Sequence, residues 1–225
     1  MAEVRSSVKA CKVSRGRPFT LCVLCPLTFL ASSPVMLFQG RPGRRLLFPS
    51  LCSATVDVKL DPATAHPGLL LSPDGKSARD GGDHQKVPDG PQRFDVFGSV
   101  VGLGALPPGR SYWEVEVGDK TGWDLGVARR DARRKGRLSL DPANGYWVAV
   151  HFEGEKYAAM TAPPVRLPLT RRPRRVGVFV DRAEGLVSFY DAAAKSHMYS
   201  FVGCAGPNFI FFLNGAIFTH ALMET

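Results

Sequence analysis

The chain has 225 residues, of which 44% are hydrophobic and 22% are charged, so its composition suits a folded globular protein and excludes a chain that is disordered throughout. The length fits one all-β domain with an extension, or at most two small domains. The net charge of +9 suggests a nucleic-acid-binding surface, but residues 1–55 hold eight of the 29 basic side chains and one of the 20 acidic ones. Residues 56–225 therefore carry a net charge of only +2, and no nucleic-acid partner is expected.

Residues 1–55 combine basic stretches with an apolar run over 19–38 and show no sustained period of a helix or a strand. The run is interrupted by Pro26 and Pro34, which makes it a poor membrane span, since a span needs about 20 apolar residues. A basic segment followed by apolar residues and then by small ones, at 31–33, is also the order of a secretory signal. We expect an irregular N-terminal extension and a cytoplasmic location, with membrane association through residues 19–38 as the alternative.

Four of the five cysteines lie within the first 52 residues, and Cys204 is the only one in the rest of the sequence. A disulfide-built extracellular domain would carry paired cysteines in its body, so residues 56–225 suit a reducing compartment. Cys22 and Cys25 have the spacing of half a zinc site, but a structural zinc needs four ligands and no second pair follows. We expect neither a metal nor a cofactor.

From Val56 onward, short runs of β-branched and aromatic residues alternate with turn residues at roughly the spacing that is typical of a β-sandwich or barrel. Only 191–196 resembles a helical turn, and no stretch has the pattern of a longer amphipathic helix. We predict an all-β domain, with a hairpin turn at 182–185. Strands are predicted over 112–117, 123–129, 145–152, 175–181 and 186–191.

Alternation within the predicted strands indicates which side chains share a face of the sheet. Val148, Val150 and Phe152 fall together on one side of their strand. We assign Trp113 and Trp147 to the core, because large aromatic side chains contribute most of the buried apolar area.

No arrangement of catalytic residues stands out in the sequence. The histidines are isolated from one another, and there is no G-x-S-x-G turn for a serine nucleophile. The run 102–107 begins like a dinucleotide-binding loop, but it has Pro107 in place of the third glycine and no helix follows. Glu114 and Glu116 lie on one side of a strand and not across a cleft. The chain is therefore not expected to be an enzyme.

Seven short sequence blocks follow one another between residues 60 and 191. They are 60–72 (LDPATAHPGLLLS), 93–95 (RFD) with 100–103 (VVGL), 112–118 (YWEVEVG), 123–129 (WDLGVAR), 145–147 (GYW), 174–181 (RRVGVFVD) and 187–191 (VSFYD). In this order they resemble the PRY-SPRY domains of tripartite-motif ubiquitin ligases and butyrophilins. One such block alone would be weak support, whereas seven in order are specific.

The resemblance implies a bent antiparallel β-sandwich, a concanavalin-like jelly roll, with PRY at about 56–108 and SPRY at about 109–225 behind the extension 1–55. It also implies that loops and one concave face bind a protein or peptide partner. The chain departs from the family at 213–225, which is short and lacks the usual ending, so we expect the last strand to pair poorly. The sequence contains no RING or B-box series of Cys and His and no coiled-coil heptads, so this chain alone lacks ubiquitin-ligase machinery.

By resemblance, Asp124, Val150 and Phe152 fall at positions where ligand-binding relatives carry contact residues. Phe152 is the strongest candidate, since large apolar anchors dominate interfaces, and the alternative is that it packs in the core. The resemblance thus implies a non-catalytic protein-protein interaction module. It would be the targeting end of a tripartite-motif or butyrophilin-like product, in ubiquitination or innate immune signalling.

Two predicted loops, 129–137 and 171–175, are rich in arginine. Arg133, Arg134 and Arg172 could form an anion-binding patch, and some butyrophilin relatives use a basic pocket in this domain for phosphorylated small molecules. The other interpretation is that these loops are ordinary solvated connections between strands. Binding of a phosphorylated small molecule or another anion is therefore the alternative function.

Overall fold

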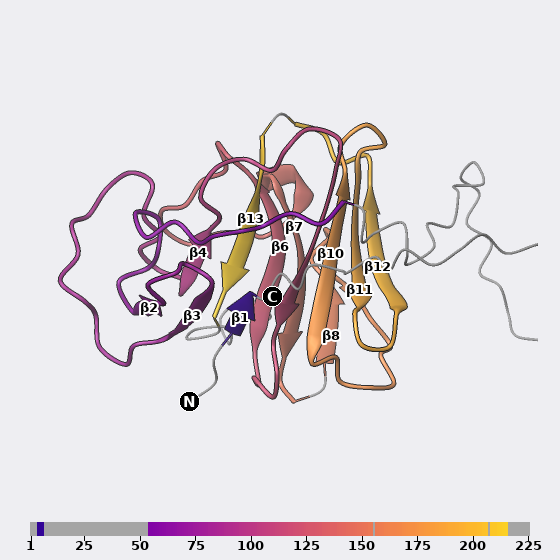
Figure 1. Ribbon diagram of the computed structural model, residues 1–225, viewed down its shortest axis with the longest axis horizontal. Helices are drawn as coiled ribbons and strands as arrows, with labels where there is room; N and C mark the ends of the chain where they lie inside the picture. Colours follow the sequence, from indigo (N-terminus) through magenta and orange to yellow (C-terminus); the bar gives the residue numbers. More distant parts are fainter. Residues whose placement is uncertain (1–3, 7–53, 155, 207, 216–225) are drawn as a thin grey trace, which may run out of the picture.

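The computed structural model describes residues 4–6, 54–154, 156–206 and 208–215, and these residues form two β-sheets that pack face to face (Figure 1). One short 3₁₀ turn, η1, interrupts the succession of strands. The elements are β1 (Val4–Ser6), β2 (Leu69–Leu71), β3 (Ser77–Asp80), β4 (Ser99–Val101), β5 (Arg110–Glu116), β6 (Trp123–Arg129), η1 (Pro142–Asn144), β7 (Tyr146–Phe152), β8 (Lys156–Ala159), β9 (Val165–Arg166), β10 (Arg175–Asp181), β11 (Leu186–Asp191), β12 (Ser196–Val202) and β13 (Phe209–Asn214).

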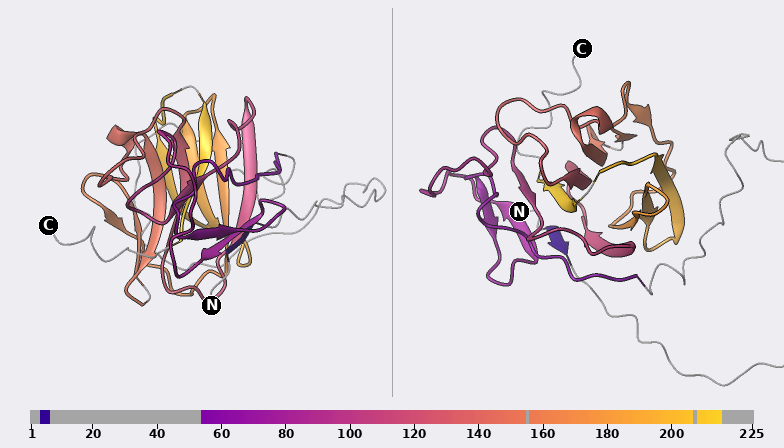
Figure 2. Two further views of the ribbon diagram at one scale, coloured as in Figure 1. Left: turned by 90° about the vertical axis from the view of Figure 1, so that its left-hand side faces the viewer. Right: turned by 90° about the horizontal axis from the view of Figure 1, so that it is seen from above.

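Every pairing between these strands is antiparallel, which confirms the predicted all-β sandwich. The seven-stranded sheet has the order β12-β11-β10-β5-β1-β3-β2, and the six-stranded sheet has the order β4-β13-β6-β7-β8-β9. Strands β2 and β3 lie at one end of the molecule and β11 and β12 at the other (Figures 1 and 2).

The last described strand, β13, lies inside the six-stranded sheet between β4 and β6. Its residues pair with β6 in continuous register from Phe209 to Asn214, and its second half also pairs with β4. Alternate residues of β13 are apolar and are buried between the sheets. The expectation of a poorly paired last strand concerns 213–225, of which only Leu213 and Asn214 pair here with β6 and β4, so it stays a prediction for the rest of that segment. Residues 216–225 lie outside the described part of the chain.

The segment 1–55 was expected to be irregular, yet the backbone of 4–6 forms β1 and pairs with both β3 and β5. Thr55 also makes a parallel bridge to Tyr112 of β5. The apolar run 19–38 and the pair Cys22 and Cys25 fall outside the described residues. Within the ranges that the structure does describe, no helix is long and apolar enough to cross a membrane.

The main core lies between the two sheets and is built from alternate residues of the strands. Trp113 and Trp147 are both buried there, as predicted. Their rings pack edge-to-face against two rings of β13, with centroid distances of 5.7 Å from Trp113 to Phe211 and 5.0 Å from Trp147 to Phe209. Such aromatic pairs stabilise the sandwich beyond the area that they bury.

The seven-stranded sheet ends in two hairpins that are closed in the same way. Asp181 accepts hydrogen bonds from two backbone N–H groups of the loop 182–185, and Asp191 does the same for the loop 192–195. Short carboxylate side chains favour such turns because they satisfy backbone donors locally. The stretch 191–196, which resembles a helical turn in sequence, is therefore a hairpin connection between β11 and β12.

Candidate functional site

The outer face of the six-stranded sheet is covered by a second apolar layer. Phe94 and Phe97, which precede β4, and Leu138 and Leu140, from the loop after β6, pack on this face. Below them lie outward-facing side chains of the sheet, including Val148. The strands in the middle of this sheet are thus buried on both sides, which is why their burial does not alternate.

One row of residues crosses the six-stranded sheet on that outer face. In the register of the strands, paired residues stand side by side and share a face. The row runs Ser99, Asn214, Asp124, Val150, Ala158 and Arg166, from β4 to β9. Its side chains are polar at the β4 side, small and apolar in the middle, and basic at the exposed edge strand.

Asp124 lies in the middle of this row and is almost completely buried, with 2% of its surface exposed. Nδ2 of Asn214 donates a hydrogen bond to its Oδ2 at 2.7 Å. Burial raises the pKa of Asp124 to about 7, and the Asn214 hydrogen bond acts in the opposite direction. A partner therefore cannot reach this carboxylate in the structure as it stands, which corrects the expectation of direct contact.

Val150 and Phe152 lie on the same face as Asp124, as the alternation predicts. Val150 pairs with Asp124 in register and is also buried. Phe152 is the last residue of β7, is half-buried, and packs against the second apolar layer. Of the three residues, only Phe152 reaches the surface, beside its register partner Lys156.

The structure does not bring Arg133, Arg134 and Arg172 together. Arg172 donates to the backbone oxygen of Lys120, just before β6, whereas Arg133 and Arg134 follow the end of β6. The seven residues of β6 place its two ends about 20 Å apart. These three residues therefore do not form one patch, because Arg172 lies beside the start of β6 and Arg133 and Arg134 lie beyond its end.

Arg134 is a structural residue and not a free surface charge. Its side chain is 7% exposed, its Nη1 and Nη2 donate to the backbone oxygens of Gln92 and Arg130 at 3.2 and 3.0 Å, and its guanidinium lies 6.0 Å from the ring centre of Phe94. Arg133 is exposed and donates to the backbone oxygen of Lys135.

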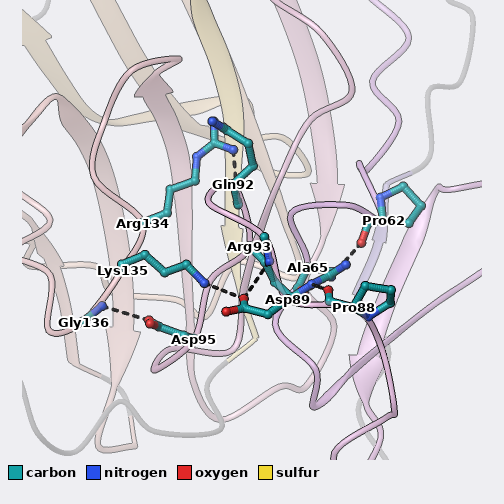
Figure 3. A network of polar contacts seen from close by, with 11 residues as sticks. Pro62, Ala65, Pro88, Asp89, Gln92, Arg93, Asp95, Arg134, Lys135 and Gly136 are labelled. Atoms are coloured by element: carbon teal, nitrogen blue, oxygen red, sulfur yellow. Dashed lines mark hydrogen bonds and ion pairs between the residues drawn. The ribbon is translucent and has the colours of Figure 1, made fainter.

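The loop 130–136 is joined to the segment 88–95 by several polar contacts (Figure 3). Arg93 anchors that segment, since its guanidinium donates to the backbone oxygens of Pro62, Ala65 and Pro88 at 2.7–2.9 Å. This role of Arg93 was not predicted from the sequence. The available signal was a single arginine beside Phe94 in the block 93–95, which does not reveal three backbone acceptors from other positions in the sequence.

A pocket of about 610 Å³ opens beside these loops. Its lining comes from five places in the sequence. The residues are Asp61, Ala63, Thr64, Gln92, Val101, Gly102, Gly104, Arg130, Asp131, Arg134, Asn208 and Ile210. This volume is in the usual range of ligand pockets. The pocket adjoins the end of β6 at Arg129, where β7 begins, and is therefore about 20 Å along the sheet from Phe152.

Within the described residues, no group of three or more His, Cys, Asp or Glu side chains is placed to hold a metal ion. The pocket lining mixes guanidinium groups, carboxylates, amides and glycine backbone. Hydrogen bonding and ion pairing are the chemistry that this lining supports.

Two family models match the chain, the SPRY-associated domain (PRY) over residues 58–106 and the SPRY domain over residues 110–219. The chain is similar to pyrin of Homo sapiens, with 48% identity over 154 residues that cover 68% of this chain and 20% of pyrin. It is also similar to butyrophilin subfamily 1 member A1 of Bos taurus, with 49% identity over 146 residues that cover 65% of this chain and 28% of the relative.

Among solved structures, the TRIM65 PSpry domain superposes with a TM-score of 0.65 at 20% identity, over 81% of this chain and 93% of that domain, which supports the fold. The chain thus spans about a fifth to a third of the length of the curated relatives that it matches. Because both family models match in the expected order, the chain belongs to the PRY-SPRY family, whose domains are protein-binding modules.

Proposed function

We propose that this chain recognises a segment of a partner protein through the surface around Phe152. In this proposal it is the targeting unit of a tripartite-motif or butyrophilin-like protein that acts in ubiquitination or innate immune signalling, and it performs no catalysis itself. We also propose a cytoplasmic location, with residues 19–38 as the alternative route to a membrane.

The observation that carries this proposal is the placement of Phe152. It is a large apolar side chain at the end of a strand, half-exposed, with its inner side held by the second apolar layer. Interfaces depend on a few such anchors, and an anchor on a rigid strand loses little conformational entropy on binding. Arg166 of the edge strand β9 is exposed and shares the face of Phe152 in register through Ala158 and Val150, so it adds a positive charge beside this surface.

Asp124 and Val150 support this surface from beneath. Val150 lies two residues before Phe152 on the same face of β7 and is buried there. Asp124 joins β6 to β13 through its hydrogen bond from Asn214. We propose that Asp124 is a positioning residue, which acts on binding through the packing of the row and not by touching the partner.

The proposal is tested by affinity capture with the full chain, the Phe152→Ala variant and the Val202→Ala variant. Val202 is 72% exposed on β12 of the other sheet, so it is a matched apolar control. We expect each captured partner to bind Phe152→Ala at least tenfold more weakly, which is about 1.4 kcal/mol, while Val202→Ala binds like the unchanged protein. Equal binding of all three proteins, at equal thermal stability, would contradict the assignment of this surface.

A further inference from the structure

The pocket beside Arg130 and Arg134 lies outside the Phe152 surface and has its own charge pattern. Arg134 is held rigidly at its wall by the two backbone oxygens, and Arg130 lies exposed at its rim. Neither guanidinium forms an ion pair with a carboxylate among the residues that the structure describes. A rigid cation and a neighbouring exposed cation therefore face the same space.

These two like charges act on one another. Burial is the main cause that lowers the pKa of the Arg134 guanidinium, and the charge of Arg130 acts in the same direction. Tyr146 and Asp61 oppose the shift. An anion bound between the two arginines would relieve both the repulsion and part of the cost of burial.

The remaining charges of the lining set the charge of the ligand. Asp131 is already paired with Arg129, whose Nε lies 3.2 Å from its Oδ1. Asp61 forms no ion pair among the described residues, so Arg130, Arg134 and Asp61 leave one unbalanced positive charge. A carboxylate supplies one negative charge, whereas a phosphate group carries close to two at neutral pH. The lining thus suits a carboxylate better than a phosphate.

The lining also indicates that the carboxylate belongs to a polypeptide. Gln92 and Asn208 are exposed amides at the pocket, and Gly104 has open space around its Cα, so a ligand backbone can approach them. Leu103, between two lining glycines, is 63% exposed and is therefore open to an apolar side chain of a longer ligand that extends beyond the pocket. A free inorganic anion would use neither the amides nor the leucine.

We propose that this pocket is a second binding site, which takes the Asp or Glu side chain of a segment of a partner protein between Arg130 and Arg134. Arg134 is the fixed half of the site, since its two backbone hydrogen bonds and its position over the Phe94 ring preorganise it. Arg130 is the exposed half and would pair with the carboxylate from the rim. Arg93 is a positioning residue, because it anchors the segment that carries Gln92.

The probe is a synthetic library of N-acetylated, C-amidated 12-residue peptides with every position randomised, presented to the full-length chain. Enriched peptides are then resynthesised with Glu, Gln or phosphoserine at the enriched acidic position and titrated by fluorescence anisotropy. The proteins are the unchanged chain, Arg130→Gln, Arg133→Gln and Phe152→Ala. Arg133 is the matched control, because it is an exposed arginine of the same loop that does not line the pocket.

We expect the enriched peptides to share an Asp or Glu at one position, and the change of that Glu to Gln to weaken binding at least tenfold. Arg130→Gln should weaken the Glu peptide to the same extent and should remove the difference between Glu and Gln, as a double-mutant cycle requires of two groups in contact. Arg133→Gln and Phe152→Ala should bind within about twofold of the unchanged protein. Arg130→Gln should also keep the unchanged thermal unfolding curve, since its side chain is exposed.

Four results would overturn the proposal. These are the absence of any retained peptide, enrichment without an acidic position, an unchanged Glu-to-Gln difference in Arg130→Gln, and tighter binding of phosphoserine than of Glu. Loss of binding in Phe152→Ala alone would assign the peptides to the Phe152 surface, which would refute the second site and support the first. If the Phe152 proposal fails, the double-mutant cycle between Arg130→Gln and the Glu-to-Gln peptides is unaffected. Failure of the first site and failure of the second are therefore distinguishable.

Discussion

Asn214 donates a hydrogen bond from Nδ2 to Oδ2 of Asp124 across the β13–β6 pair, at 2.7 Å, and both side chains are buried. On the next strand of the same row, Oγ of Ser99 has no hydrogen-bond partner, and Oδ1 of Asn214 has none either, among the described residues. A carboxylate in such surroundings is costly when charged, which is the physical reason for its raised pKa.

The pH dependence of stability follows from this site. The pKa of Asp124 is about 7 in the folded protein and close to 3.8 in the unfolded chain. The stability that Asp124 contributes is therefore fully present below pH 3.8 and is lost as the pH rises through 7. We expect Asp124→Asn, which keeps an acceptor for Asn214, to gain stability relative to the unchanged protein between pH 5 and 8, by roughly 2–3 kcal/mol at most. Urea unfolding at pH 5, 6.5 and 8 measures this. The exposed Asp131→Asn variant is the control. A difference in the free energy of unfolding between Asp124→Asn and the unchanged protein that stays constant from pH 5 to pH 8 would refute the expectation.

The pH dependence of stability that His66 contributes has the opposite sign to that of Asp124. Its Nδ1 accepts a hydrogen bond from the backbone N–H of Gly68 at 3.1 Å, and its ring packs edge-to-face on His84 at 5.1 Å. Burial lowers the pKa of His66, and the His84 charge adds to this, so stability is complete above 6.5 and is lost as the pH falls through the folded value. We expect His84→Gln to raise the pKa of His66, measured by NMR titration of its ring protons. An identical titration in both proteins would exclude the contact with His84 as a cause.

A comparison of Gly185 and Gly203 distinguishes the cost of a left-handed φ from the cost of steric crowding. Gly185 and Gly203 both have left-handed φ values, 58° and 70°, but a Cβ on Gly185 would lie 3.1 Å from the backbone oxygen of Cys204, whereas a Cβ on Gly203 would meet no atom within 4 Å. Gly203→Ala should cost about 1 kcal/mol from its φ alone. Gly185→Ala should cost more, and thermal unfolding of the two variants measures the difference. Equal losses would show that the loop shifts to accommodate the methyl group.

Arg93 should be among the most sensitive polar positions of the described chain. Arg93→Ala leaves three backbone oxygens without their donor, and we expect a loss of roughly 2–4 kcal/mol in the free energy of unfolding. Arg93→Lys should recover only part of this loss, because an ammonium cannot reproduce the guanidinium fork. Lys135→Ala, which breaks an exposed ion pair with Asp89 in the same network, should change stability little. A loss in Lys135→Ala as large as that in Arg93→Ala would mean that the exposed pair contributes as much as the buried anchor.

Much of the fold could be predicted from the sequence because strands carry their own period. Alternation identified β5, β6, β7, β10 and β11 but neither β8 nor β9, and Trp113 and Trp147 were assigned correctly to the core. The second apolar layer could not be found in this way. Phe94 and Leu138 lie in loops, which have no period, and their packing on the outer face depends on the tertiary path of the chain.

The candidate site was only partly predictable for the same reason. Alternation places Asp124 and Phe152 on one face, and the structure agrees, but alternation cannot say that loops cover that face and bury Asp124. The arginine clusters are similar in composition, and only the tertiary structure places Arg172 beside Lys120, before β6, and Arg133 beyond the other end of that strand. The pocket at Arg130 is assembled from five distant segments, so no local sequence pattern predicts it.

The central claim is that a partner binds at the Phe152 end of the six-stranded sheet. Residue-resolved NMR of the full chain, titrated with a partner that distinguishes Phe152→Ala from Val202→Ala, tests it most directly. The account predicts that the amide shifts concentrate at Phe152, Lys156 and Arg166, with little change in the hairpin loops 182–185 and 192–195. Shifts concentrated in those hairpins, with β7 to β9 unchanged, would contradict it.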